Sequence, residues 1–141
     1  MANVADIAQY FNAQFWELSK IKLQKLLYFA QAWSLGKNDQ ELFPDDFVAW
    51  KLGPALKELH KSMHDCEKVV PLEIPGSDID RLTNGDMQSL DSVLAFYGDM
   101  TKEELIDLAH QDNVWKNALR DAVIPKEAIK ALYRDRKCPL R

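Results

Sequence analysis

The spacing of apolar residues predicts a helix over about residues 4–14. Its apolar positions, three or four residues apart, are Val4, Ile7, Ala8, Phe11 and Phe15. This spacing is the stripe that one buried helix face produces. Asn3 stands just before the stripe and is a favoured N-cap residue.

The most strongly patterned segment predicts a second helix over residues 20–35, with Ser19 as its N-cap and Gly36 as its C-cap. The second half of this helix is apolar on almost every side, which is typical of a helix at the centre of a core. Its first turns carry polar side chains that we predict to be solvated, namely Lys20, Lys22, Gln24 and Lys25.

The helical pattern breaks after this segment. Residues 42–50 combine a turn signal at Pro44 with the strand-forming residues Phe47, Val48 and Trp50, and predict a short hairpin or extended crossing. A helix is predicted to start at Gly53-Pro54, because proline is tolerated in the first helical turn. Residues 66–84 carry no firm pattern and indicate either a short strand at KVVPLEI or a mobile segment with a function of its own.

Helical signals resume at Thr83–Asp86, at the capping box Thr101–Glu104, at Asn113 and at Pro125. We therefore predict a mostly α, compact single domain over residues 1–141. It would contain six to seven short helices around a central buried helix, with one small extended or hairpin segment near residues 42–50.

Amino-acid composition indicates the cellular compartment of the protein more than its function. The chain has 141 residues, 47% of them apolar, only two cysteines and a net charge of −4. No apolar run reaches the ~20 residues of a membrane span, and the first residues lack the pattern of a signal peptide. We expect a cytoplasmic protein without disulfides. The negative net charge disfavours nucleic acid as a partner and favours a partner with a basic surface.

Motifs for catalysis are few. Gly-rich phosphate loops, nucleophile elbows and paired-cysteine metal motifs are missing from the sequence. His60 and His64 share a helix face, and with Cys66 they leave open a metal-dependent hydrolase. A solvated helix end, with cationic side chains near its C-terminus, is the favoured explanation of these histidines. A second alternative is a DNA-binding regulator with a helix-turn-helix over residues 101–120.

The four tryptophans favour a binding role, because Trp is a frequent anchor of protein interfaces. Trp16 and Trp50 lie outside the long predicted helices and are the candidates for exposed anchors. Trp33 and Trp115 are predicted to pack in the core.

Several ordered blocks resemble one known family. They are KLQKLLYFAQAWSLG (Lys22 to Gly36), LFPDDFVAWKLGP (Leu42 to Pro54), LDSVLAFYGDMTKEELIDLAHQDNVWKNA (Leu90 to Ala118) and IPKEAIKALY (Ile124 to Tyr133). Together they resemble the Panacea domain, the SocA-like family of phage- and mobile-element-associated antitoxins. The first two blocks are the specific ones.

The resemblance implies a protein without catalytic residues, cofactors or metal that binds and neutralises a cognate toxin. One branch of the family delivers its toxin to a ClpXP-type protease, so an adaptor role is a second expectation. As candidate contact residues we take Trp50, Lys51, Pro54, Gln24 and Lys25. The motif residues that we expect to be structural are Leu26, Leu27, Tyr28, Trp33, Gly53, His110 and Trp115.

Overall fold

The computed structural model describes residues 1–63, 68–69 and 74–140. Its elements are α1 (Val4–Ala13), β1 (Leu18–Ser19), α2 (Lys20–Asn38), β2 (Val48–Trp50), β3 (Gly53–Ala55), α3 (Lys57–Ser62), β4 (Lys68–Val69), the 3-10 helix η1 (Ile79–Arg81), α4 (Asn84–Tyr97), α5 (Lys102–His110), α6 (Asn113–Lys116) and α7 (Lys126–Arg134). The prediction of a compact, mostly α fold is confirmed. None of the described helices is long and apolar enough to cross a membrane.

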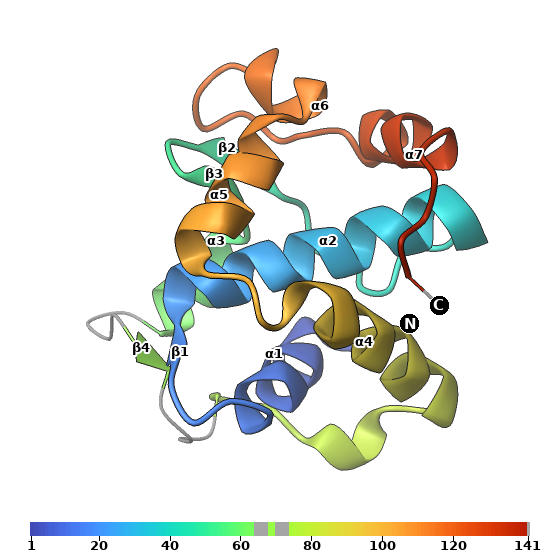
Figure 1. The fold of residues 1–141 in the computed structure, drawn as a ribbon. Helices are drawn as coiled ribbons and strands as arrows, with labels where there is room; N and C mark the ends of the chain where they lie inside the picture. The colour runs from blue at the N-terminus through green and yellow to red at the C-terminus, as the bar shows by residue number, and fades with distance from the viewer. Residues whose placement is uncertain (64–67, 70–73, 141) are drawn as a thin grey trace.

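Helix α2 runs through the middle of the molecule, with α7 on one side and α1 and α4 on the other (Figure 1). Every residue of α2 from 23 to 35 is buried, which confirms the prediction of a central helix. Ser19 is its N-cap, as predicted, and the hydroxyl accepts a hydrogen bond from the backbone N–H of Lys22 at 3.1 Å. The core of the protein is therefore organised around one helix that is buried on all sides.

The C-terminal end of α2 differs from the prediction. The helix continues through Gly36 to Asn38, and Asp39 is the left-handed C-cap at φ 56°. Gly36 instead permits the close approach of α7, because a Cβ atom built there would lie 2.6 Å from the backbone carbonyl carbon of Tyr133. The prediction that Gly36 ends the helix is therefore wrong. A glycine is needed here because α7 packs directly against this position.

Local capping signals correctly predicted the starts of α1, α4 and α5. The Asn3 side chain accepts from the backbone N–H of Ala5 at 2.9 Å. Thr83 and Thr101 both form complete capping boxes, with Asp86 and Glu104 respectively. These interactions join residues two or three positions apart, so the sequence contains all the information that they need.

The extended segment is a hairpin over residues 48–55, in which Val48, Ala49 and Trp50 pair with Ala55, Pro54 and Gly53. The prediction that Gly53-Pro54 starts a helix is wrong. Gly53 has a φ of +114°, which a helix does not allow, and α3 begins at Lys57. The hairpin also pairs with residues 121–124, because Ala49 bonds Asp121 and Ala122 through its backbone groups.

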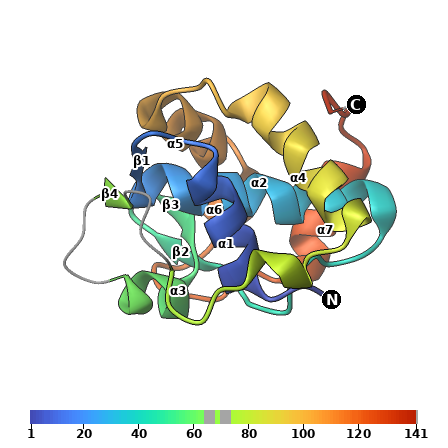
Figure 2. The same ribbon diagram turned by 90° about the horizontal axis from the view of Figure 1, so that it is seen from below.

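Residues 66–84, which carried no firm pattern, contain a strand at Lys68–Val69 and the 3-10 helix η1. Strand β4 pairs antiparallel with β1, and the two lie side by side at one end of the molecule (Figure 2). Of the two interpretations of KVVPLEI, the short strand is supported at those two residues.

Candidate partner-binding site

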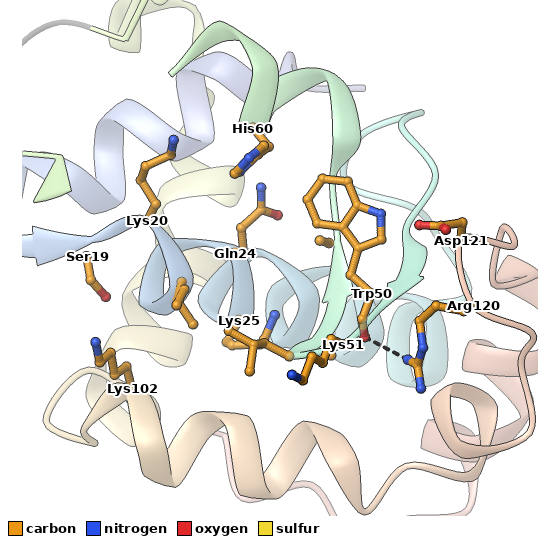
Figure 3. Close-up of a pocket in the computed structure, with 14 residues that line it drawn as sticks. Ser19, Lys20, Gln24, Lys25, Trp50, Lys51, His60, Lys102, Arg120 and Asp121 are labelled. Carbon is orange, nitrogen blue, oxygen red and sulfur yellow. Dashed lines mark hydrogen bonds between the residues drawn. The ribbon is translucent and has the colours of Figure 1, made fainter. Parts of the chain in front are cut away.

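A groove of about 800 Å³ lies between the first turns of α2, the β2–β3 hairpin, the start of α5 and the loop after α6 (Figure 3). It contains four of the five candidate contact residues, namely Gln24, Lys25, Trp50 and Lys51. These segments lie far apart along the chain, and the packing of the hairpin and α5 against α2 brings them together. The groove is therefore the candidate site.

Gln24 joins α2 to the hairpin. Its side-chain amide donates to the carbonyl of Leu56 at 3.1 Å and accepts from the N–H of the same residue at 2.7 Å. Gln24 was predicted to be solvated, and this is wrong, because its side chain is only 4% exposed. An amide is needed because only Asn and Gln offer a donor and an acceptor side by side to a backbone unit.

Lys25 lies beneath the hairpin and is also buried, contrary to the prediction of a solvated side chain. It is 2% exposed, and its Nζ donates to the carbonyl of Pro54 at 2.9 Å. Gly53 makes room for this lysine, since a Cβ there would lie 3.0 Å from Lys25 Cε. Within the described residues Lys25 forms no ion pair, and desolvation lowers its pKa to about 7.

Lys25→Met is expected to remove a pH dependence from the stability of the protein. The pKa of Lys25 is about 7 in the folded chain against an ordinary 10.5. Between these values the unfolded chain binds more protons, so the free energy of unfolding rises with pH. From about pH 7 to about pH 9 this rise amounts to about 2 kcal/mol. Urea unfolding of both proteins at the two pH values measures the difference.

The matched control is Lys57→Met, which changes an exposed lysine on α3 in the same way. It should keep the pH dependence of the wild-type protein. An identical rise in Lys25→Met and wild type would mean that Lys25 remains fully protonated in the folded chain at pH 7.

The turn of the hairpin presents Trp50 and Lys51 at the edge of the groove. Lys51 is exposed, and Trp50 is half-buried with its ring edge-to-face against His60 at a centroid distance of 5.1 Å. Pro54, the remaining candidate contact residue, is buried and gives its carbonyl to Lys25. Pro54 does not line the groove, because the hairpin packs that residue against α2, and its role in partner binding stays a prediction.

His110 and Trp115 contact the backbone of the β2–β3 hairpin turn. The Trp115 indole donates to the Trp50 carbonyl at 2.7 Å, and the His110 Nε2 lies 3.2 Å from the Lys51 carbonyl. Their rings stack on each other at a centroid distance of 4.1 Å. These contacts fix the hairpin turn to α5 and α6, so the exposed side chains stand on a rigid support.

The remaining motif residues lie in the core. Leu26, Leu27 and Trp33 are buried. The Tyr28 hydroxyl donates to Asp112 Oδ2 at 2.6 Å, where the hydroxyl of Tyr133 also donates at 2.6 Å. Burial raises the pKa of Tyr28 well above its ordinary value, so this hydroxyl stays a donor. Sequence reasoning did not identify Asp112 as the acceptor that joins α2 to α7.

The sequence patterns did not place two basic residues, Lys102 and Arg120, at the candidate site. Lys102 and Arg120 line it with Lys20, Lys25 and Lys51. Lys102 was noted only as part of a capping box, and Arg120 only within the helix-turn-helix alternative. No local signal links these residues, because they come from segments up to a hundred positions apart.

The first alternative function, a metal-dependent hydrolase, depends on His60, His64 and Cys66. His60 lines the groove, and desolvation lowers its pKa with a further effect of Lys20. His64 and Cys66 lie outside the described residues. Among the residues that are described, no group of three or more His, Cys, Asp or Glu side chains is placed to hold a metal ion.

The helix-turn-helix alternative is not supported, because α6 is a single turn, Asn113–Lys116, too short to serve as a recognition helix. The prediction that Asn113 is the N-cap of α6 is wrong, because the N-cap is Asp112. The Asp112 carboxylate points toward Tyr28 and Tyr133.

Comparison with known proteins assigns the family. A family model described as antitoxin SocA-like, Panacea domain matches residues 23–116, about two thirds of the chain. Searches of curated proteins and of solved structures return no match. The matched residues include the buried part of α2, the hairpin and α5. The chain belongs to the antitoxin SocA-like, Panacea domain family.

Proposed function

We propose that this protein is an antitoxin that neutralises a cognate toxin by direct binding, with the groove and the hairpin turn as its contact face. The observation that supports this most is that the family match includes α2 from residue 23 onward, the hairpin and α5, which form most of the groove. The family is described as an antitoxin family, and a groove beside a half-buried tryptophan and exposed charged side chains suits protein binding.

The contact face has the features of a preorganised surface. Trp50 and Lys51 stand on a turn that His110 and Trp115 hold in place. A rigid turn loses little conformational freedom on binding, which favours affinity. Trp16, 95% exposed at the end of the segment before β1, is a further candidate anchor away from the groove.

Co-expression with the product of the neighbouring gene tests the proposal. We expect this chain to restore growth and to capture the gene product in a pull-down. The variant Trp50→Ala/Lys51→Ala should raise the Kd about 30-fold, since truncating an interface anchor costs about 2 kcal/mol.

The matched control is Phe96→Ala/Lys137→Ala, which removes a partly exposed aromatic ring and an exposed lysine outside the groove. It should bind like the wild-type chain. If no neighbouring gene product binds the wild-type chain, the proposed function is wrong.

Neutralisation can occur by holding the toxin or by delivering it to a ClpXP-type protease. We propose holding, in the cytoplasm, the compartment expected from the composition. Purified chain should then inhibit purified toxin at equimolar ratio without any protease. Growth rescue that requires the protease, with no inhibition by the purified chain, would favour delivery instead.

A further inference from the structure

The groove carries a charge opposite to that of the whole protein. The chain has 22 acidic residues against 18 Lys and Arg. Among the described residues, the groove is lined in contrast by five basic side chains and one carboxylate: Lys20, Lys25, Lys51, Lys102, Arg120 and Asp121. A positively charged groove on an acidic protein favours an anionic partner by electrostatic complementarity.

The described residues supply these basic side chains with no carboxylate partner. Elsewhere in the fold, lysines such as Lys126 and Lys130 are paired with Glu41 and Asp39. Within the described part of the chain, none of the five groove cations forms an ion pair. Their charges repel one another, so an anion bound between them would relieve that repulsion.

The cations are distributed along the groove and do not converge on one point. Lys20 and Lys102 lie at one end, Lys25 and Lys51 in the middle, and Arg120 at the other end (Figure 3). The apolar side chains of the lining are those of Ile21, Trp50, Leu52 and Ala55. A single compact anion would reach one part of this row, whereas an extended segment with alternating carboxylate and apolar side chains matches its whole length.

We propose that the groove binds an acidic, extended peptide segment of the toxin. The inference rests on the proposed function and names the part of the partner that is recognised. It also reverses the expectation from net charge, which favoured a basic partner surface, because the local charge of the groove and not the total charge of the chain faces the partner.

Lys25 gives the groove a deep anchor point. Its ammonium group is buried under the hairpin and donates to one carbonyl, that of Pro54. A carboxylate that enters from the groove supplies the missing counter-charge. A carboxylate beside Lys25 raises the pKa of this lysine toward its ordinary value, so that the lysine is charged when the peptide is bound. It also places one carboxylate of the peptide beneath Trp50 and Lys51.

Charge reversal on the rim tests the proposal. We expect Lys51→Glu/Lys102→Glu to raise the Kd for the neighbouring gene's toxin about 30-fold or more at about 50 mM salt. The wild-type affinity should fall about tenfold between roughly 50 and 300 mM salt. Circular dichroism and thermal unfolding verify that the variant is folded, which both exposed positions allow.

The matched control is Lys116→Glu/Lys137→Glu, which makes the same change in net charge at two exposed lysines outside the groove. It should change the Kd less than about threefold. Equal losses in the two variants would assign the effect to total charge and overturn the proposal. A groove variant that binds the toxin like wild type would also overturn it, while leaving the proposed function intact.

Fluorescence polarisation with overlapping toxin peptides of about 15 residues identifies the segment. Binding should be confined to peptides that contain several Asp or Glu residues and be lost in Lys51→Glu/Lys102→Glu. ATP and a single-stranded oligonucleotide serve as the other anionic probes. If either binds the groove more tightly than every toxin peptide, the occupant carries phosphate and the proposal is wrong.

Discussion

Asp112→Ala is expected to lower the free energy of unfolding by about 3–5 kcal/mol, because it breaks a buried, charged cluster. The Asp112 carboxylate is 1% exposed and accepts from the hydroxyls of Tyr28 and Tyr133. Arg136 pairs with its other oxygen at 2.9 Å. The variant leaves two buried hydroxyls and a guanidinium without their acceptor, and each loss destabilises the folded chain.

Thermal and urea unfolding measure the effect, and a protein of this size should lose roughly 10 °C or more in Tm. Asp107→Ala is the control, because it removes an exposed carboxylate of α5 and should change stability by less than about 0.5 kcal/mol. Similar stabilities of the two variants would show that water replaces the carboxylate and that the cluster does not join α2 to α7.

Gly36→Ala is expected to destabilise the protein by about 3 kcal/mol, although alanine is the better helix former. The added Cβ would lie 2.6 Å from the backbone carbon and the Cβ of Tyr133 and 2.9 Å from the backbone nitrogen of Arg134. Backbone atoms cannot rotate out of the way as a side-chain end can. The two helices must therefore move apart, and the packing around Tyr133 is lost with them.

Gly85→Ala provides a control with the opposite sign. Gly85 lies in the first turn of α4, and the nearest atom to an added Cβ is 3.8 Å away. This change should raise the free energy of unfolding by about 0.5–1 kcal/mol. If both glycine variants were stabilised, the close approach of α2 and α7 would be wrong. Urea unfolding of the two variants under one set of conditions separates these outcomes.

The difference between these glycines shows that sequence patterns within one helix do not predict contacts between helices. A glycine near the end of a helical pattern predicts a C-cap, and Gly36 fits that pattern equally well whether or not another helix passes there. Likewise, Gly53-Pro54 matches the start of a helix. The strand found there depends on pairing with Val48–Trp50 and on the lysine of α2 that occupies the space beside Gly53.

The residues of the candidate site also differ in how well the sequence predicted them. Trp50 and Lys51 were identified from their place outside the helices and from the family resemblance. Gln24 and Lys25 were predicted as candidates too, but with the wrong environment, because polar residues in the first turns of a helix are usually solvated. Lys102 and Arg120 were missed as members of a site, since each has an ordinary explanation within its own segment.

The sequence by itself determined the mostly α fold, the central position of α2, the capped helix starts and the family. Each of these depends on residues a few positions apart or on ordered motifs, which can be recognised without knowing what packs against them. Only the tertiary structure decided that Lys25 is buried, that Asp112 joins two helices and that five cations share one groove. Those properties arise from distances between distant segments, and Coulomb and desolvation energies depend on such distances and not on separation along the chain.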